Sequence, residues 1–311
     1  MKLIYKKTDG TIARFFAMLI LAFLISSCGS AKSIGKTVNH GVVPPPGEKI
    51  YKKLTTDYSK IIKEEEPILL IGDSASIVPS MWYPTVNFNL RKPNFVVLHH
   101  TTQSSCGATL KAFSMESREV SSHYLICKDG QVYRLCNDYL RTWHAGEGKW
   151  GNVEDMNSCS IGIEIDNNGS EAFTDNQVSS VIVLLDSLQK KYNIPQANII
   201  GHSDFSPKRK QDPSAFFPWE KLAKRNFGYW RDEVLSSTPA DFNYIYALKM
   251  IGYDISDEKS AIIAFKRHFI QNDLKPVLTD FDKQVIYNIW GKYMELKPKI
   301  KKPTNLNGQE K

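Results

Sequence analysis

The sequence predicts an α/β domain followed by a small three-helix bundle. Between about residues 80 and 232, short β-branched runs alternate with helical patterns, whereas from about residue 236 only helical patterns remain. The length of 311 residues suits two domains, because one domain usually has roughly 100–200 residues. Apolar residues at 42% and charged residues at 23% are typical of a globular protein.

The N-terminus predicts an export signal. Basic residues precede the apolar run FFAMLILAFLIS, which at about a dozen residues is too short to span a bilayer but suits the core of a secretory signal. The run ends in Ile25, Ser26, Ser27 and Cys28, which resembles the bacterial lipoprotein signal, whose cysteine is acylated. We therefore expect residues 1–28 to be a lipoprotein signal peptide and Cys28 to carry a lipid anchor. An ordinary signal peptide with an incidental cysteine is the alternative.

Residues 29–79 are expected to form a tether and an N-terminal extension. The tether contains Gly, Ser, Lys and the run VVPPPG, a composition that favours extended chain. In the extension, apolar residues recur at helical spacing and predict a short amphipathic helix over 48–63. These residues are Ile50, Leu54, Tyr58 and Ile61. The run ILLIG that follows predicts a strand.

Three segments of the region 80–232 read as strands. FVVLH at 95–99 and SIGIEI at 160–165 are apolar and β-branched, and HYLICKDGQVYRL contains two strands around the turn signal Lys128, Asp129, Gly130. One helix follows SIGIEI in the chain. Thr174 and Gln177 are spaced as a capping box, and the apolar stripe after them ends near Asn193.

Residues 236–296 are expected to form the helical bundle. Thr238 and Pro239 should open one helix, a second should run through SAIIAFKRHFI, and Thr279 with Asp282 should cap a third. A bundle of about 60 residues is small and suits an accessory module. Residues 297–311 should form a basic tail.

The charge limits the partners that we expect, and the cysteine spacings limit the metal sites. The net charge of +7 is modest, and basic and aromatic residues do not interleave, so we expect no nucleic-acid partner, although mild attraction to an anionic polymer is compatible with it. Beyond Cys28 the cysteine spacings are unlike those of a cysteine zinc site. Disulfides and buried free thiols both remain open for these cysteines. They are Cys106, Cys127, Cys136 and Cys159.

Two segments offer metal ligands. In GHSDFSPKRKQDP, His202 and Asp212 stand ten residues apart among turn formers, so we expect a loop here rather than a helix. His99 closes an apolar strand, where a side chain can project into a cleft. Two imidazoles and a carboxylate are a ligand set that catalytic zinc uses, with the fourth position left to water. A histidine at a strand end, taken alone, is more often a core or surface residue.

The segment SIGIEID adds a polar strand face. Its three isoleucines face one side of the strand, and Gly162, Glu164 and Asp166 face the other. A carboxylate beside a glycine indicates an open, polar side. Taken alone, the segment is better explained as a half-buried strand with a solvated face.

Together these segments resemble the zinc-dependent type 2 N-acetylmuramoyl-L-alanine amidases, the family shared with phage amidase lysozymes and peptidoglycan recognition proteins. In chain order, they are NFNLRKPNFVVLHHT (87–101), SSHYLICKDGQVYRL, TWHAG, SIGIEID and GHSDFSPKRKQDP, and they cover about 150 residues. The resemblance implies a mixed β-sheet flanked by helices over 80–232. It also implies zinc held by His99, His202 and Asp212. His99 rather than His100 is taken as the ligand because the family's ligand lies two places before a Thr or Ser.

The resemblance further implies roles for individual residues. Glu164 would be the acid/base residue, and Lys210 would lie beside the developing oxyanion. Trp143 and His144 also match family positions and are expected to line the substrate groove, whereas His123 is expected to be buried and hydrogen-bonded.

Further positions bear on the surroundings of the site and on the C-terminal segment. Asp166 is a candidate for supporting the ligands indirectly. Lys208 and Ser214 stand where the family commonly has glycine, so we expect the loop path and the groove beside it to differ. The segment YALKMIGYDISDEKSAIIAFKRHFI resembles the small three-helix peptidoglycan-binding domain, although Phe265 and Phe269 are most simply core residues of a helix pair.

The expected function is zinc-dependent hydrolysis of the amide bond between N-acetylmuramic acid and L-alanine in peptidoglycan. The expected location is the cell envelope, lipid-anchored in the outer membrane and facing the periplasm. One alternative is a recognition protein that binds peptidoglycan without cutting it, but such proteins characteristically lose a metal ligand, and all three positions are filled here. A zinc amidase for a small acylated amine is a second alternative, which the lipid anchor and helical module argue against.

Overall fold

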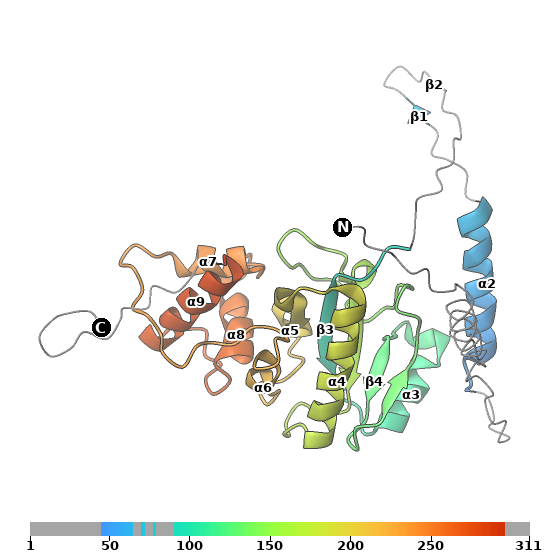
Figure 1. Ribbon diagram of the computed structural model, residues 1–311, viewed down its shortest axis with the longest axis horizontal. Coiled ribbons are helices and arrows are strands. Elements are labelled where there is room, and N and C mark those ends of the chain that lie inside the picture. Colours follow the sequence, from blue (N-terminus) through green and yellow to red (C-terminus); the bar gives the residue numbers. More distant parts are fainter. Residues whose placement is uncertain (1–44, 65–69, 72–76, 79–89, 296–311) are drawn as a thin grey trace, which may run out of the picture. The chain divides into compact units, whose positions relative to one another are not determined.

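The computed structural model describes residues 45–64, 70–71, 77–78 and 90–295 (Figure 1). The predicted signal peptide with Cys28, most of the predicted tether and the predicted tail at 297–311 lie outside the described residues. In the described ranges, no helix combines the length and the apolar character that crossing a membrane requires.

The described part of the N-terminal extension contains one helix and two short strands. The helix, α2, runs from Glu48 to Glu64 and confirms the predicted amphipathic segment; none of its residues is buried. Strands β1 (Leu70–Ile71) and β2 (Ile77–Val78) pair antiparallel, and β1 falls within the predicted ILLIG strand.

A five-stranded mixed sheet forms the centre of the α/β domain, as expected. Its strand order is β5-β4-β6-β3-β7. Strands β4, β6, β3 and β7 are parallel, whereas β5 pairs antiparallel with β4 across the predicted turn at Gly130. The bounds are β3 Phe95–His100, β4 Tyr124–Ile126, β5 Val132–Arg134, β6 Ser160–Ile165 and β7 Ile199–Gly201.

One face of the sheet packs against α4 (Asp175–Tyr192), the helix drawn in front of the sheet between the labels of β3 and β4 in Figure 1. The predicted capping box is present, since Thr174 and Gln177 exchange side-chain to backbone hydrogen bonds. Apolar side chains of β3 and β6 and the stripe of α4 form a common core. The sequence predicted that the three isoleucines of β6 share one face of the strand. This is confirmed, because all three are completely buried in this core.

Residues on the other face of the sheet share a buried apolar cluster with the C-terminal helices. These are α7 (Tyr244–Ile251), α8 (Glu258–Phe269) and α9 (Asp280–Tyr293). Phe95 and Val97 of β3 belong to the same buried cluster as Phe265 and Phe269 of α8. The three helices therefore share a hydrophobic core with the sheet.

The first of these helices does not begin where the sequence predicted. It starts at Tyr244, because the side chain of Asn243 accepts a hydrogen bond from Tyr246 N at 3.0 Å and caps the helix there. Thr238 instead contacts the hydroxyl of Tyr244 at 3.1 Å. The capping box of Thr279 and Asp282 is confirmed at the start of α9.

Two helices and a disulfide complete the domain. Helices α3 (Cys106–Phe113) and α6 (Trp219–Ala223) were not predicted from the sequence. A disulfide joins Cys106, the first residue of α3, to Cys127, which follows β4. For this pair of cysteines the disulfide alternative is therefore correct.

Candidate metal centre

His99, His202 and Asp212 converge at one edge of the sheet. Their candidate ligand atoms all lie within 4.8 Å of one another. Asp212 Oδ2 is 2.9 Å from His99 Nδ1 and 3.0 Å from His202 Nδ1. The two histidines are 1% and 2% exposed, and the side chain of Asp212 is 12% exposed. The structure thus brings together the three residues that the sequence singled out as ligands, and it leaves His100 outside the cluster.

The parallel strands explain this convergence. His99 lies near the carboxyl end of β3, and His202 follows directly after β7, its neighbour in the sheet. Because carboxyl ends of parallel strands meet at one edge, the two imidazoles come together there. Asp212 is attached to the same turn, since Ser203 N donates to the backbone oxygen of Asp212 at 2.7 Å.

The hydrogen bonds fix which nitrogen of His202 carries its proton. Burial lowers the pKa of His202 to about 4, so the ring is neutral near pH 7 and carries one N–H. Nε2 lies 2.8 Å from the carbonyl oxygen of Ala145, which can only accept. Nε2 therefore donates, and the lone pair of Nδ1 faces Asp212.

A chain of polar groups fixes the tautomer of His99 in the same way. Ser160 Oγ donates to the carbonyl oxygen of Met156, so it accepts from His144 Nε2, 3.2 Å away. His144 Nδ1 is then an acceptor for His99 Nε2 at 3.1 Å. This leaves the Nδ1 lone pair of His99 facing Asp212. Burial, and then the nearby His99, hold the pKa of His144 well below its ordinary value, so this ring is neutral as well.

Three lone pairs therefore point at one another in a buried site. An Asp carboxyl group is ordinarily ionised near pH 7, so Asp212 adds the lone pair of a carboxylate oxygen. Two imidazole lone pairs that face a carboxylate oxygen at about 3 Å repel it unless a cation lies between them. The donor set is the one that zinc takes in catalytic sites, so these residues fit a zinc ion.

Glu164 lies on the same side of the sheet as His99. The two residues are register partners in the parallel pair β3–β6, which places their side chains on one face. Glu164 Oε2 is buried and has no hydrogen-bond partner in the described part of the chain. Burial raises the pKa of Glu164 to about 7, and the charge of Asp212 adds to the rise while His99 and Lys210 oppose it. A carboxyl group with this pKa can exchange a proton near neutral pH.

Lys210 supplies positive charge to the same region. Its backbone N–H donates to Ser206 O at 2.9 Å, which folds the segment after His202 back toward the centre. Its charge lowers the pKa values of both Glu164 and His202. Lys210 therefore contributes positive charge to the surroundings of Glu164 and His202.

Trp143 and His144, the two residues expected to line the groove, differ in solvent exposure. Trp143 is 53% exposed and is available for contact with a ligand. His144 is 8% exposed, and its ring contacts His99 and approaches Gly162, where a Cβ atom would lie 2.4 Å from His144 Cγ. The glycine in the SIGIEID strand thus leaves room for the His144 ring. His123 is fully buried and hydrogen-bonded, as expected.

The segment after β7 is not entirely loop. Residues His202–Phe205 form one helical turn, α5, which corrects the prediction of a loop. The reason is Asp204, whose side chain accepts from the backbone N–H of Gly201 at 2.7 Å and closes the turn. The sequence signal was present as a carboxylate three residues after a glycine, but turn formers on either side obscured it.

Two supporting residues were missed by the sequence reasoning. Asn157 Oδ1 accepts from the backbone N–H groups of His144 and Ala145, at 3.0 and 2.8 Å. Arg209 donates to the carbonyl oxygens of Ala145 and Glu147. Both hold the segment whose carbonyl orients His202. Asp166 accepts from Thr101 Oγ1 at 3.4 Å and does not contact the three-residue cluster in any described hydrogen bond.

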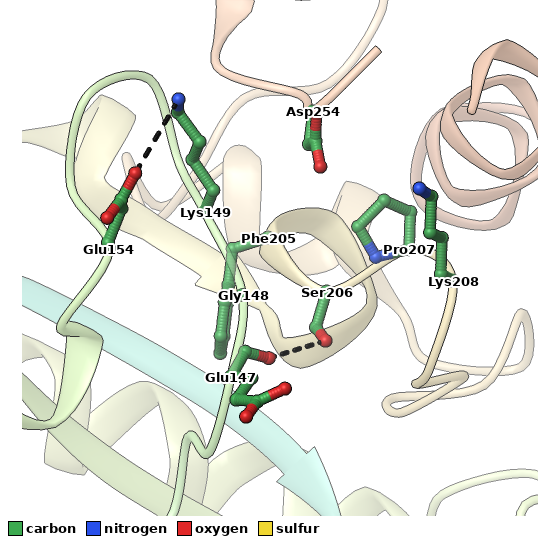
Figure 2. A pocket seen from close by; sticks show the side chains of 9 residues that line it. All are labelled: Glu147, Gly148, Lys149, Glu154, Phe205, Ser206, Pro207, Lys208 and Asp254. Atoms are coloured by element: carbon green, nitrogen blue, oxygen red, sulfur yellow. Dashed lines mark hydrogen bonds and ion pairs between the residues drawn. The ribbon is translucent and has the colours of Figure 1, made fainter. Parts of the chain in front are cut away.

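A pocket of about 390 Å³ opens beside α5 (Figure 2). Phe205 forms one wall, and the ring of the same residue stacks on His202 at 4.9 Å. Figure 2 shows Lys149 paired with Glu154 on one side, and Lys208 and Asp254 on the other. None of the three cluster residues lines this pocket.

The two positions that depart from the family pattern lie close to the centre. Lys208 reaches out of its loop and donates to Ser256 Oγ at 3.1 Å, so it contacts the C-terminal helical segment. Ser214 N donates to His100 Nδ1 at 3.1 Å, and its side-chain oxygen is buried without a partner among the described residues.

Residues 89–215 match the family described as N-acetylmuramoyl-L-alanine amidase. The chain is 29% identical over 208 residues to the N-acetylmuramoyl-L-alanine amidase AmiD of Escherichia coli, covering 56% of this chain and 74% of that relative. It is 40% identical over 103 residues to the 1,6-anhydro-N-acetylmuramyl-L-alanine amidase AmpD of Haemophilus influenzae, covering 33% of this chain. The match spans only about half of AmpD, 56% of its length.

Solved structures show the same fold. AmpDh3 of Pseudomonas aeruginosa superposes with a TM-score of 0.61 at 24% identity, covering 70% of this chain and 98% of that one. AmiD of Escherichia coli, solved with anhydro-N-acetylmuramic acid-L-Ala-D-gamma-Glu-L-Lys, gives a TM-score of 0.59 at 23% identity. That superposition covers 72% of this chain and 97% of AmiD. Both alignments cover more of the chain than the 89–215 match, so the shared fold extends beyond it.

Proposed function

We propose that this chain, whose residues 89–215 form a domain of the N-acetylmuramoyl-L-alanine amidase family, is a zinc-dependent enzyme that hydrolyses the amide bond between N-acetylmuramic acid and L-alanine in peptidoglycan. The observation that carries the proposal is the convergence of three lone pairs from His99, His202 and Asp212, with Glu164 on the same sheet face and its Oε2 without a hydrogen-bond partner among the described residues. A recognition protein needs no such combination.

Each residue has a chemical task in this reaction. His99, His202 and Asp212 would hold the zinc ion, which, when bound, supplies a Lewis acid and makes water a better nucleophile near neutral pH. Glu164 accepts a proton from the attacking water and passes it to the leaving nitrogen, a role that its pKa of about 7 suits.

The remaining groups act on the intermediate and on the substrate. Lys210 places positive charge where the tetrahedral oxyanion develops. The exposed indole of Trp143 offers an apolar surface to the peptide or the sugar. The buried His144 keeps His99 in the tautomer that presents its Nδ1 lone pair.

The location is also part of the proposal. The disulfide between Cys106 and Cys127 supports an oxidising compartment, because disulfides persist mainly outside the cytosol. Together with the signal-like N-terminus and Cys28, this supports a lipid-anchored enzyme of the cell envelope that faces the periplasm. Peptidoglycan is present there as the substrate.

The test is an assay of protein that begins at Gly29, incubated with purified peptidoglycan. Mass spectrometry should detect stem peptides that begin with L-alanine, a chelator should abolish their release, and added zinc should restore it. The same assay with anhydro-muropeptides tests whether released fragments are also cut. Binding to peptidoglycan with no peptide release at any zinc concentration would overturn the proposal and favour a recognition protein.

A further inference from the structure

A carboxylate from the turn that carries His202 is held by the C-terminal helices. Asp204 lies two residues after His202 and is 1% exposed. Its Oδ1 accepts from the hydroxyl of Tyr253 at 2.8 Å, and its Oδ2 accepts from His268 Nδ1, also at 2.8 Å. Both donors lie beyond residue 215, where the match to the amidase family ends.

The same carboxylate also defines the backbone of the turn. Asp204 Oδ2 accepts from Gly201 N at 2.7 Å, and Gly201 is both the last residue of β7 and the N-cap of α5. His202 is the first residue of α5, so its backbone lies inside the ring that this hydrogen bond closes. The position of the Asp204 carboxylate therefore determines where β7 ends and how the His202 side chain leaves the sheet.

The donors themselves are fixed by packing. The ring of His268 is 3% exposed and stacks on the indole of Trp219, with 3.8 Å between ring centroids. The ring of Tyr253 is 2% exposed and packs edge-on against Trp150 at 5.0 Å. Neither donor can follow the carboxylate if α5 shifts. Helix α8 lies beside α5 in Figure 1.

We propose that His268 and Tyr253 are positioning residues of the metal centre, through which the C-terminal helices hold Asp204 and fix the turn that presents His202. The helical segment is then part of the metal centre rather than an appendage to it. A buried carboxylate that loses a donor keeps its desolvation cost, so the turn rearranges toward solvent and the three ligand atoms no longer converge. The inference rests on the proposed function only in taking zinc as the bound ion.

Two substitutions remove the donors and keep the packing. Tyr253→Phe deletes one hydroxyl, and His268→Phe keeps a ring that can stack on Trp219 while removing the N–H. Each should raise the dissociation constant for zinc about 10-fold or more, the usual scale for groups that orient metal ligands. The visible spectrum of the Co²⁺-substituted protein should also change, because it reports ligand geometry. At saturating zinc, kcat should return toward the wild-type value.

Tyr244→Phe is the matched control. It also removes a tyrosine hydroxyl from the C-terminal helices, one that shares a hydrogen bond with Thr238 Oγ1 at 3.1 Å. Its zinc affinity and Co²⁺ spectrum should equal those of the wild type, whatever its thermal stability. The milder Tyr253→Phe carries the test if His268→Phe does not fold.

The outcomes separate the two proposals. Wild-type zinc affinity and an unchanged Co²⁺ spectrum in Tyr253→Phe would overturn the positioning role and leave the amidase proposal standing. Weakened zinc binding in the two variants but not in Tyr244→Phe would support the positioning role. If the two variants weaken zinc binding but the wild type releases no stem peptide, the positioning role stands and only the proposed amidase reaction is wrong.

Discussion

His144 Nδ1 lies 3.1 Å from His99 Nε2, in a position where it can only accept the proton of that ring. His144→Ala removes this acceptor and frees His99 to adopt the other tautomer, in which Nδ1 carries the proton and cannot bind a cation. We expect zinc affinity to fall about 10- to 100-fold. Competition with a chromogenic chelator measures it. Tyr124→Phe, which removes a buried hydroxyl from the hydrogen bond to Asp138, serves as the control and should bind zinc normally.

Glu164→Gln should nearly abolish hydrolysis and leave zinc bound. Loss of an acid/base residue typically costs about 10² to 10⁴ in rate. In the wild type, kcat/KM should fall as the pH drops through the pKa of Glu164, between its ordinary value of 4.5 and the value of about 7 caused by burial. A bound cation shifts this limb toward the lower end. An unchanged acidic limb in the residual activity of Glu164→Gln would show that another group is titrating.

The same substitution should stabilise the metal-free protein above neutral pH. Because the pKa of Glu164 is higher in the folded state, that state binds more protons than the unfolded state between pH 4.5 and about 7. Wild-type stability therefore falls as the pH rises through this window, and the neutral amide removes the fall. Denaturant titrations should show Glu164→Gln more stable than wild type at pH 8 and equal to it at pH 4. Equal stabilities at pH 8 would contradict a buried, ionised carboxylate.

Lys210→Met should lower kcat by roughly 10² to 10³, the usual cost of losing one group that stabilises an oxyanion. Zinc affinity should not change, because Lys210 is not a ligand. Lys210→Arg keeps the charge, yet its larger planar head is aimed differently and should restore only part of the rate. Steady-state kinetics at saturating zinc measure both. Full recovery in Lys210→Arg would mean that the charge alone, and not its placement, matters.

Removing the disulfide should destabilise the domain by about 2–4 kcal/mol, the typical value for a native crosslink. The bond joins residues that are 21 apart in sequence and ties the start of α3 to the sheet. Cys106→Ser with Cys127→Ser should show this loss, and a reductant should produce the same loss in the wild type. Cys159→Ser is the control, because its thiol contacts only backbone oxygens in the described hydrogen bonds.

Local patterns predicted most of the regular elements. Strands β3 and β6 follow from unbroken β-branched runs, and α4 and α9 follow from capping boxes, because these signals depend on residues that are close in sequence. The cluster of His99, His202 and Asp212 could be predicted because the segments that carry these residues resemble a known zinc amidase family. A strand end and a run of turn formers alone left other interpretations open. Strand β7, with three residues, is too short to show any periodicity.

Tertiary contacts account for what the sequence could not indicate. The continuous apolar run of β3 indicates a strand that is buried on both faces, but it does not indicate that Val97 packs in the same cluster as Phe265. The role of His144 depends on a ring nitrogen that lies 45 residues from its partner. The sequence pattern placed the start of this helix at Thr238 and Pro239, whereas α7 begins at Tyr244, after the Asn243 cap.

The hydrogen bond between Asp204 and His268 joins residues that are 64 positions apart, and this has a consequence for synthesis. During translation, the turn that carries His202 emerges well before the two side chains that hold its carboxylate. A product that ends before Tyr253 has every ligand in its sequence but neither of the two donors that hold Asp204. If these donors position the metal centre as proposed, such a product should bind zinc more weakly than the full chain does.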